Sequence, residues 1–232
     1  MLVSIYGSAL LTQFVAITMA IVGKALYWKA LFQQVITISS EDLSAANRIF
    51  VCLSAHFVQN GIGLLVESVR NSVKAVFEKV PLQEPTSQTL LSSLISQVRH
   101  ELETTCGRNI LIDCLFGRLD EMISADLSST RRRLFIALAT EARRIIKNVS
   151  TKEILTRQID LEVNELVESA VTNSAVPFIS IIPKVNAKFT NPTITPKNLL
   201  SQFEIELKKA AAAVFVCKDH SDITDIFMSS IK

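Results

Sequence analysis

The chain has 232 residues, of which 49% are hydrophobic and 20% charged, and its formal net charge at pH 7 is +2. This composition supplies enough apolar residues for a packed core, which excludes a disordered chain, and the small net charge excludes a strong field attracting nucleic acid. Glycine and proline are scarce, and aliphatic residues recur at spacings of three and four. The sequence therefore predicts an all-α fold of long helices, with residues 1–232 forming a single helical domain.

The first predicted helix covers about residues 2–37, and residues 1–23 carry no charge. That stretch is long enough to span a bilayer. No basic region precedes it, which does not fit a signal peptide. The residues leave two alternatives open: a core helix that is hydrophobic on nearly every face, or a membrane span with Lys24 and Lys29 on the cytosolic side.

A second long helix is predicted from about residue 40 to 79. Ser39 or Ser40 can cap its start, and the acidic residues Glu41 and Asp42 suit its first turn. Gly61 and Gly63 interrupt it midway, which indicates a close helix crossing or a kink rather than a catalytic loop.

Shorter helices follow the loop that contains Pro81 and Pro85. Ser128 and its neighbours can cap one of them, and Ser150 or Thr151 another. The remaining predicted helices cover about 86–104, 109–123, 128–148, 150–171, 195–216 and 221–231. No segment alternates with period two, so we predict no sheet.

The sequence contains no motif typical of an enzyme. The three histidines have no nucleophile motif nearby, and Glu162, Glu165 and Glu168 lack the Glu-x-x-His partner of a di-metal site, so they are interpreted as a solvated face. The four cysteines, at positions 52, 106, 114 and 217, show no CxxC or metal-binding spacing and are interpreted as free thiols. We therefore predict a binding or scaffold protein without catalytic residues, metal, cofactor, small-molecule substrate or nucleic-acid partner.

A basic segment, "TRRRL" at 130–134, is followed by Arg143, Arg144 and Lys147. One interpretation is binding of phosphate or acidic lipid. The alternative is a charged outer face that Glu141 and the acidic residues of 120–126 neutralise.

Four stretches resemble the peroxisomal biogenesis factor 3 (peroxin-3) family, in the family's order. They are "VSIYGSALLTQFVAITMAIVGKALYW", "FVCLSAHFVQNGIGLLVESVRNSVKAVF", "ATEARRIIKNVSTKEILTRQIDLEVNELV" and "VPFISIIPKVN". The last matches the family's Pro-x-x-x-Ile-Ile-Pro hallmark. The resemblance implies an all-helical protein of peroxisome membrane biogenesis, on the cytosolic face of the peroxisomal membrane. It would dock the import receptor, peroxisomal biogenesis factor 19, by holding an amphipathic helix in an apolar groove.

The sequence also departs from that family. It begins after the family's membrane anchor and after a helix whose Trp fills the receptor groove, so we expect an N-terminally truncated form. The family's Arg-x-Gln-x-Asn pattern is replaced by residues 16–20, "AITMA", and a receptor-binding lysine of the hallmark is Ser180 here. The alternative function is an integral membrane protein anchored by residues 1–23, with a cytosolic helical interaction domain.

The hallmark segment predicts the local geometry of the partner site. Pro177 can start a short helix that Pro183 kinks or ends, with Phe178, Ile179, Ile181 and Ile182 packed inward and Ser180 facing the groove. By resemblance, the groove lies near the end of the first helix. The candidate partner-binding residues are Gly23, Tyr27, Trp28, Ser180 and Lys184. Trp28 is either a buried anchor or a rim residue of the groove.

Overall fold

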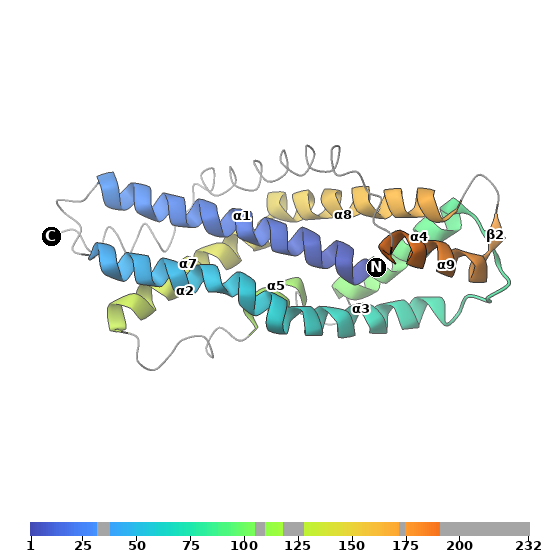
Figure 1. The fold of residues 1–232 in the computed structure, drawn as a ribbon, viewed down its shortest axis with the longest axis horizontal. Helices are drawn as coiled ribbons and strands as arrows, with labels where there is room; N and C mark the ends of the chain where they lie inside the picture. The colour runs from blue at the N-terminus through green and yellow to red at the C-terminus, as the bar shows by residue number, and fades with distance from the viewer. Residues whose placement is uncertain (32–37, 105–109, 118–127, 172–174, 191–232) are drawn as a thin grey trace.

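The computed structural model of the chain describes residues 1–31, 38–104, 110–117, 128–171 and 175–190. These residues form an elongated all-α bundle, as predicted (Figure 1). The helices are α1 (Leu2–Leu31), α2 (Ser40–His56), the π-helical turn η1 (Phe57–Gly61), α3 (Ile62–Phe77), α4 (Gln88–Thr104), α5 (Ile110–Phe116), α7 (Ser129–Lys147), α8 (Val149–Ala170) and α9 (Phe178–Thr190). The predicted helices at 195–216 and 221–231 lie outside the described residues, as do 32–37 and 118–123, so the single-domain organisation of 1–232 stays a prediction.

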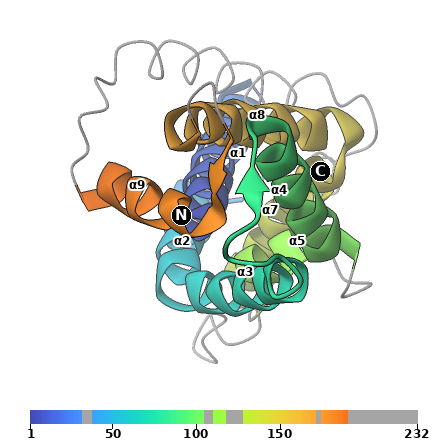
Figure 2. The same ribbon diagram turned by 90° about the vertical axis from the view of Figure 1, so that its right-hand side faces the viewer.

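Helix α1 is the central element of the bundle, because it contacts α2, α3, α7 and α8. In the end-on view of Figure 2, α8 lies on one side of α1 and α3 on the other. Buried side chains of α1 such as Tyr6, Phe14 and Ile17 belong to one hydrophobic cluster that extends into all of these helices. Burying them contributes about 1.5–3 kcal/mol for each large side chain.

Two helical segments are apolar and long enough to cross a membrane: Leu2–Leu31, with mean hydropathy 1.8, and Ser40–Phe77, with 1.7. The structure buries 56% of the apolar window of the first segment and 28% of that of the second. The burial of α1 among four helices is what the core-helix alternative for residues 1–23 predicts. Helices α2 and α3, in contrast, leave much of their apolar surface uncovered.

Three helix starts are set by local capping. The Ser39 side chain accepts a hydrogen bond from the Asp42 backbone N–H at 3.0 Å, the Ser87 hydroxyl accepts one from Leu90 at 3.2 Å, and Ser128 accepts one from Arg131 at 3.3 Å. These caps confirm the predicted helix starts near residues 40, 87 and 128. The predicted cap at Ser150 or Thr151 is wrong, because α8 already begins at Val149 and the Thr151 side chain is buried inside its first turn.

Glycine 61 marks the point where the long second helix changes its path. A Cβ at Gly61 would lie 2.1 Å from the backbone oxygen of Cys114 in α5, so only glycine permits this approach. The close helix crossing predicted at Gly61 is confirmed, and the π-helical turn η1 ends at this residue. At Gly63, in contrast, a Cβ would meet nothing within 4 Å.

The prediction of no sheet is wrong at one place. Strands β1 (Pro85–Thr86) and β2 (Val176–Pro177) pair antiparallel, with Thr86 opposite Val176. The prolines hold both segments extended, and the pairing is too short to give a period-two signal in the sequence. The backbone N–H groups of Phe178 and Ile179 donate to the oxygens of Glu84 and Leu82, at 3.1 and 3.0 Å. The first turn of α9 is therefore fastened to the loop that follows α3.

Candidate docking grooves

An apolar groove lies between α9 and the start of α1. Its volume is about 440 Å³, and it is lined by Met1, Leu2, Val3, Val69, Val73, Phe77, Leu91, Ile95, Leu166, Phe178, Ile181, Ile182 and Val185. We call it the α9 groove. The rings of Phe77 and Phe178 stack across it with centroids 5.3 Å apart, which joins α9 to α3. No charged side chain is among its lining residues, so it can recognise an apolar surface.

The hallmark helix takes a different orientation from the predicted one. It continues through Pro183 as far as Thr190, so Pro183 does not end it. Ile181 is buried and Phe178 half-buried, as predicted, but Ile179 and Ile182 are 46% and 45% exposed. The inward packing predicted for these two isoleucines is therefore wrong. The groove-facing positions of α9 are 178, 181, 182 and 185, which follow the period of an α-helix.

Ser180 and Lys184 are not among the residues that line the α9 groove. The Ser180 hydroxyl donates to the backbone oxygen of Pro177 at 2.7 Å, which satisfies a carbonyl at the start of the helix. Lys184 lies one turn further along the same face and is exposed. Their role in partner binding stays a prediction.

The other three candidate residues lie at the far end of α1. From Val3 to Trp28 the helix extends about 37 Å at the α-helical rise, so Trp28 and α9 do not share one groove (Figure 1). The expectation that α9 packs near Gly23, Tyr27 and Trp28 is therefore wrong. Gly23 and Tyr27 are exposed, and Trp28 is half-buried and packs against the hydrophobic cluster.

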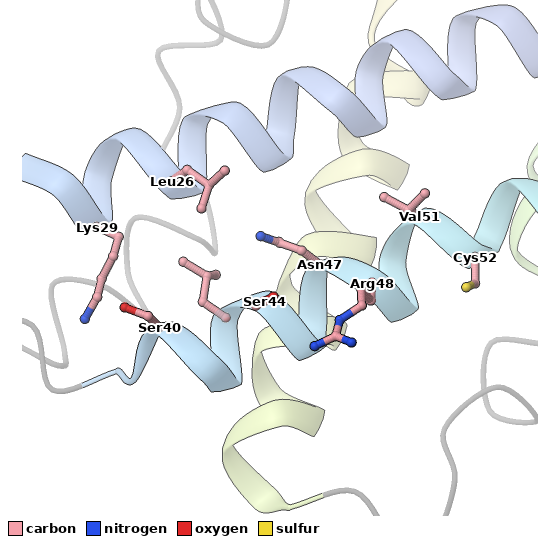
Figure 3. Close-up of a pocket in the computed structure, with 9 residues that line it drawn as sticks. Leu26, Lys29, Ser40, Ser44, Asn47, Arg48, Val51 and Cys52 are labelled. Carbon is pink, nitrogen blue, oxygen red and sulfur yellow. The ribbon is translucent and has the colours of Figure 1, made fainter.

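A second apolar groove, which we call the α1–α2 groove, lies at that far end (Figure 3). Its volume is about 550 Å³, and it is lined by Leu26, Lys29, Ser40, Leu43, Ser44, Asn47, Arg48, Val51 and Cys52. Asn47 is only 8% exposed, and its Oδ1 has no hydrogen-bond partner in the described part of the chain. An unsatisfied buried acceptor costs about 1–3 kcal/mol. Sequence reasoning missed this groove, although the predicted helix 40–79 carries its apolar positions.

Buried polar contacts hold α1 in place near the α9 groove. Tyr6 lies beside Arg99 of α4, and the Arg99 guanidinium donates to the Asp160 carboxylate of α8. Burial raises the pKa of Tyr6 to about 12, so its hydroxyl stays protonated at neutral pH. Neither Tyr6 nor this cluster was predicted, because the three residues are far apart in the sequence.

At the other end, α7 fastens both α1 and α2. Glu141 is buried and forms ion pairs with Lys24 of α1 at 3.5 Å and with Arg144 at 3.1 Å. Arg131 donates to Asp42 of α2 at 2.7 Å. Hydrogen bonds from Arg131 and from Ser39 hold the pKa of the Asp42 carboxyl below its usual range.

The basic segment is therefore divided between two environments. Arg131 and Arg144 are committed to intramolecular ion pairs, and Glu141 points inward, so it does not neutralise the outer face of α7. Arg132, Arg143 and Lys147 are exposed. The phosphate or acidic-lipid interpretation of this face stays open.

The remaining cysteine, histidine and glutamate candidates do not form a catalytic cluster within the described residues. The Cys114 thiol is buried, and this burial, followed by the nearby Asp113 charge, raises its pKa to about 12, which disfavours the nucleophilic thiolate. His56 Nδ1 lies 3.1 Å from the Asn60 side-chain amide in a small polar pocket beside Gly61. Glu165 and Glu168 are exposed, whereas burial raises the pKa of the half-buried Glu162. Among the described residues no group of three or more His, Cys, Asp or Glu could hold a metal ion.

The fold and its grooves define the class of protein. It is an all-helical protein whose candidate docking sites are open apolar grooves. The peroxin-3 family model matches residues 33–216, well over half of the chain. The chain belongs to the peroxin-3 family. No curated protein sequence matches it significantly. The family match covers three of the four stretches on which the resemblance rests, and the whole of α1 lies upstream of it.

Membership of this family gives the general role. Peroxin-3 proteins are factors of peroxisome membrane biogenesis, associated with the peroxisomal membrane and with import-related partners. Most lining residues of both grooves lie within the matched region, and those that α1 and Met1 contribute lie upstream of it.

Proposed function

We propose that this protein is a non-enzymatic docking factor on the cytosolic face of the peroxisomal membrane. In this role the α9 groove holds an amphipathic helix of the import receptor, peroxisomal biogenesis factor 19. The observation that carries the proposal is the apolar surface that the hallmark helix forms with α3 and α1, without a charged lining residue.

The geometry supports recognition of a helix. Phe178, Ile181, Ile182 and Val185 present an apolar row on one side of the groove, and Val73 and Phe77 face it from α3. An amphipathic helix binds by laying its apolar face between two such rows. The hydrogen bonds that tie Phe178 and Ile179 to residues 82–84 keep the two rows at a set separation before the partner arrives, which lowers the cost of binding.

A titration of the full chain with the N-terminal helical segment of its own organism's import receptor tests this proposal. Ile182→Asp places a charge in the groove, and we expect it to weaken binding by at least about tenfold, or about 1.4 kcal/mol. Ile179→Asp is the matched control, because Ile179 is exposed to the same extent on the same helix but does not line the groove. Equal affinities of the two variants would contradict the proposal, and circular dichroism verifies that both remain folded.

The alternative, an integral membrane protein anchored by residues 1–23, rests on the apolar window of α1. It predicts aggregation of the chain when it is produced without detergent. The docking proposal predicts a monodisperse protein under the same conditions, because α1 would be enclosed by its neighbours.

A further inference from the structure

The α1–α2 groove is an open apolar surface at the opposite end of the bundle from the α9 groove. Leu26 on α1 and Val51 on α2 face it and are 52% and 41% exposed. In Figure 3 their side chains project from the two facing helices, with Asn47 between them. Because the two grooves lie at opposite ends of α1, one short helix does not fill both.

The groove differs from the α9 groove in its unsatisfied polar groups. The Asn47 Oδ1 is a buried hydrogen-bond acceptor that lacks a donor within the described residues. The protein itself encloses this oxygen, so a ligand in the groove does not reach it; in Figure 3 the blue side-chain nitrogen of Asn47 is the end that points toward α1.

The rim of the groove is positively charged. Arg48 is exposed and forms no ion pair with any residue that the structure describes, and Lys29 donates to the backbone oxygen of Ile38. Glu41 and Asp42, at the start of α2, are paired with Arg131 of α7 and not with Arg48. The rim is therefore complementary to a carboxylate.

We propose that the α1–α2 groove binds the N-terminal turns of an amphipathic helix of a second partner protein, a helix with Asp or Glu in its first turn. This site lies beyond the docking function proposed for the α9 groove. The first turn of a helix favours acidic residues, and in this orientation they pair with Arg48, which is exposed and lines the groove. The apolar face of the same helix covers Leu26 and Val51.

The dimensions of the groove agree with this occupant. Its lining on α2 runs from Ser40 to Cys52, which is about 18 Å at the α-helical rise and corresponds to about three turns of a partner helix.

A selection experiment identifies the occupant. A displayed library of amphipathic helices of about three turns, with a fixed apolar face and randomised first-turn residues, is selected on the full chain carrying Ile182→Asp. That background disables the α9 groove, so failure at one groove is not confused with failure at the other. We expect the selected helices to carry Asp or Glu in the first turn and to lose binding when Val51→Asp is added. Selection of helices without an acidic first turn, or of none that depends on Val51, would overturn the proposal.

Fluorescence anisotropy with one selected peptide then measures the role of charge. We expect Arg48→Glu to weaken binding at least about tenfold, which is the size typical of a contact central to an interface. The matched control is Arg70→Glu, which changes another exposed arginine on the same long helical segment, outside both grooves. An equal loss in both variants would indicate general attraction between charges and overturn the assignment.

Vesicles of phosphatidylcholine and phosphatidylserine test a lipid occupant. We expect Val51→Asp to leave vesicle flotation of the full chain unchanged. If the variant abolishes flotation but preserves peptide binding, the groove is a lipid site and the proposal is wrong.

Discussion

The two ends of the bundle present apolar grooves of similar size that differ in their polar surroundings. No charged side chain lines the α9 groove, whereas Lys29 and Arg48 line the α1–α2 groove beside Asn47, whose enclosed Oδ1 is unpaired within the described residues. Apolar area alone supplies affinity, while charge and unpaired polar groups select the partner and its orientation. The α9 groove therefore fits a partner chosen by shape, and the α1–α2 groove one chosen by both shape and charge.

The ends also differ in how α1 is held. Near the α9 groove, the contacts are between Tyr6, Arg99 and Asp160, and near the α1–α2 groove between Lys24, Glu141 and Arg144. Each set connects different helices, so each end can be disturbed separately. Four substitutions follow from this difference.

The largest loss of stability is expected at Gly61, at the helix crossing that both ends of the bundle share. Gly61→Ala brings a Cβ to within 2.1 Å of the Cys114 backbone oxygen, so α3 and α5 must separate. We expect a loss of about 3 kcal/mol in the free energy of unfolding, measured by urea denaturation. Gly63→Ala is the control, since its Cβ meets nothing within 4 Å, and it should be neutral or stabilising by up to about 1 kcal/mol. Equal stability of the two variants would mean that α5 moves away from residue 61 at little cost in free energy.

A smaller effect is expected from breaking the ion pairs beneath the α1–α2 groove. Glu141→Ala leaves Lys24 and Arg144 without their shared carboxylate, and both are partly exposed, so water compensates part of the loss. We expect a loss of about 2 kcal/mol, below the usual cost of breaking a fully buried pair. Hydrogen exchange should quicken at the end of α1 more than in α9. Uniform quickening along α1 would contradict the independence of the two ends.

The acid dependence of stability should be detectable at the same end. The pKa of Asp42 is lowered in the folded protein, so its stabilising contribution is present above the unfolded-state pKa of about 4 and is lost as pH falls through the folded-state value. Asp42→Asn should remove this part of the pH dependence of thermal unfolding, which lies below about pH 4. Glu78→Gln, an exposed carboxylate in an i,i+4 pair with Lys74, is the control and should change the profile less.

The smallest effect concerns the import receptor and separates the two grooves directly. Trp28→Ala lies about 37 Å along α1 from the α9 groove, so we expect receptor affinity to change less than about twofold. Calorimetry with the receptor helix measures this. A loss as large as that of Ile182→Asp would mean that the receptor contacts both ends of the bundle.

Several local features were predictable from the sequence because their causes lie within a few residues. Ser39 and Ser128 cap their helices through contacts three residues ahead, and at Gly61 a side chain would collide with the backbone of the crossing helix α5. The cap at Ser150 or Thr151 failed for the opposite reason: the packing of α8 buries Thr151, and this outweighs its local preference for a helix end.

The amino-acid sequence by itself determined that this protein is a bundle of long helices and that it belongs to the peroxin-3 family, because helix periodicity, capping and family motifs are encoded in neighbouring residues. Only the tertiary structure decided which faces meet. It separated Trp28 from the hallmark helix, since a continuous α1 keeps Val3 and Trp28 about 37 Å apart. It left Ile179 exposed outside the α9 groove, and it left the Asn47 Oδ1 without a hydrogen-bond partner in the described part of the chain. These results depend on contacts between segments that are distant in the chain, and no local pattern records such contacts.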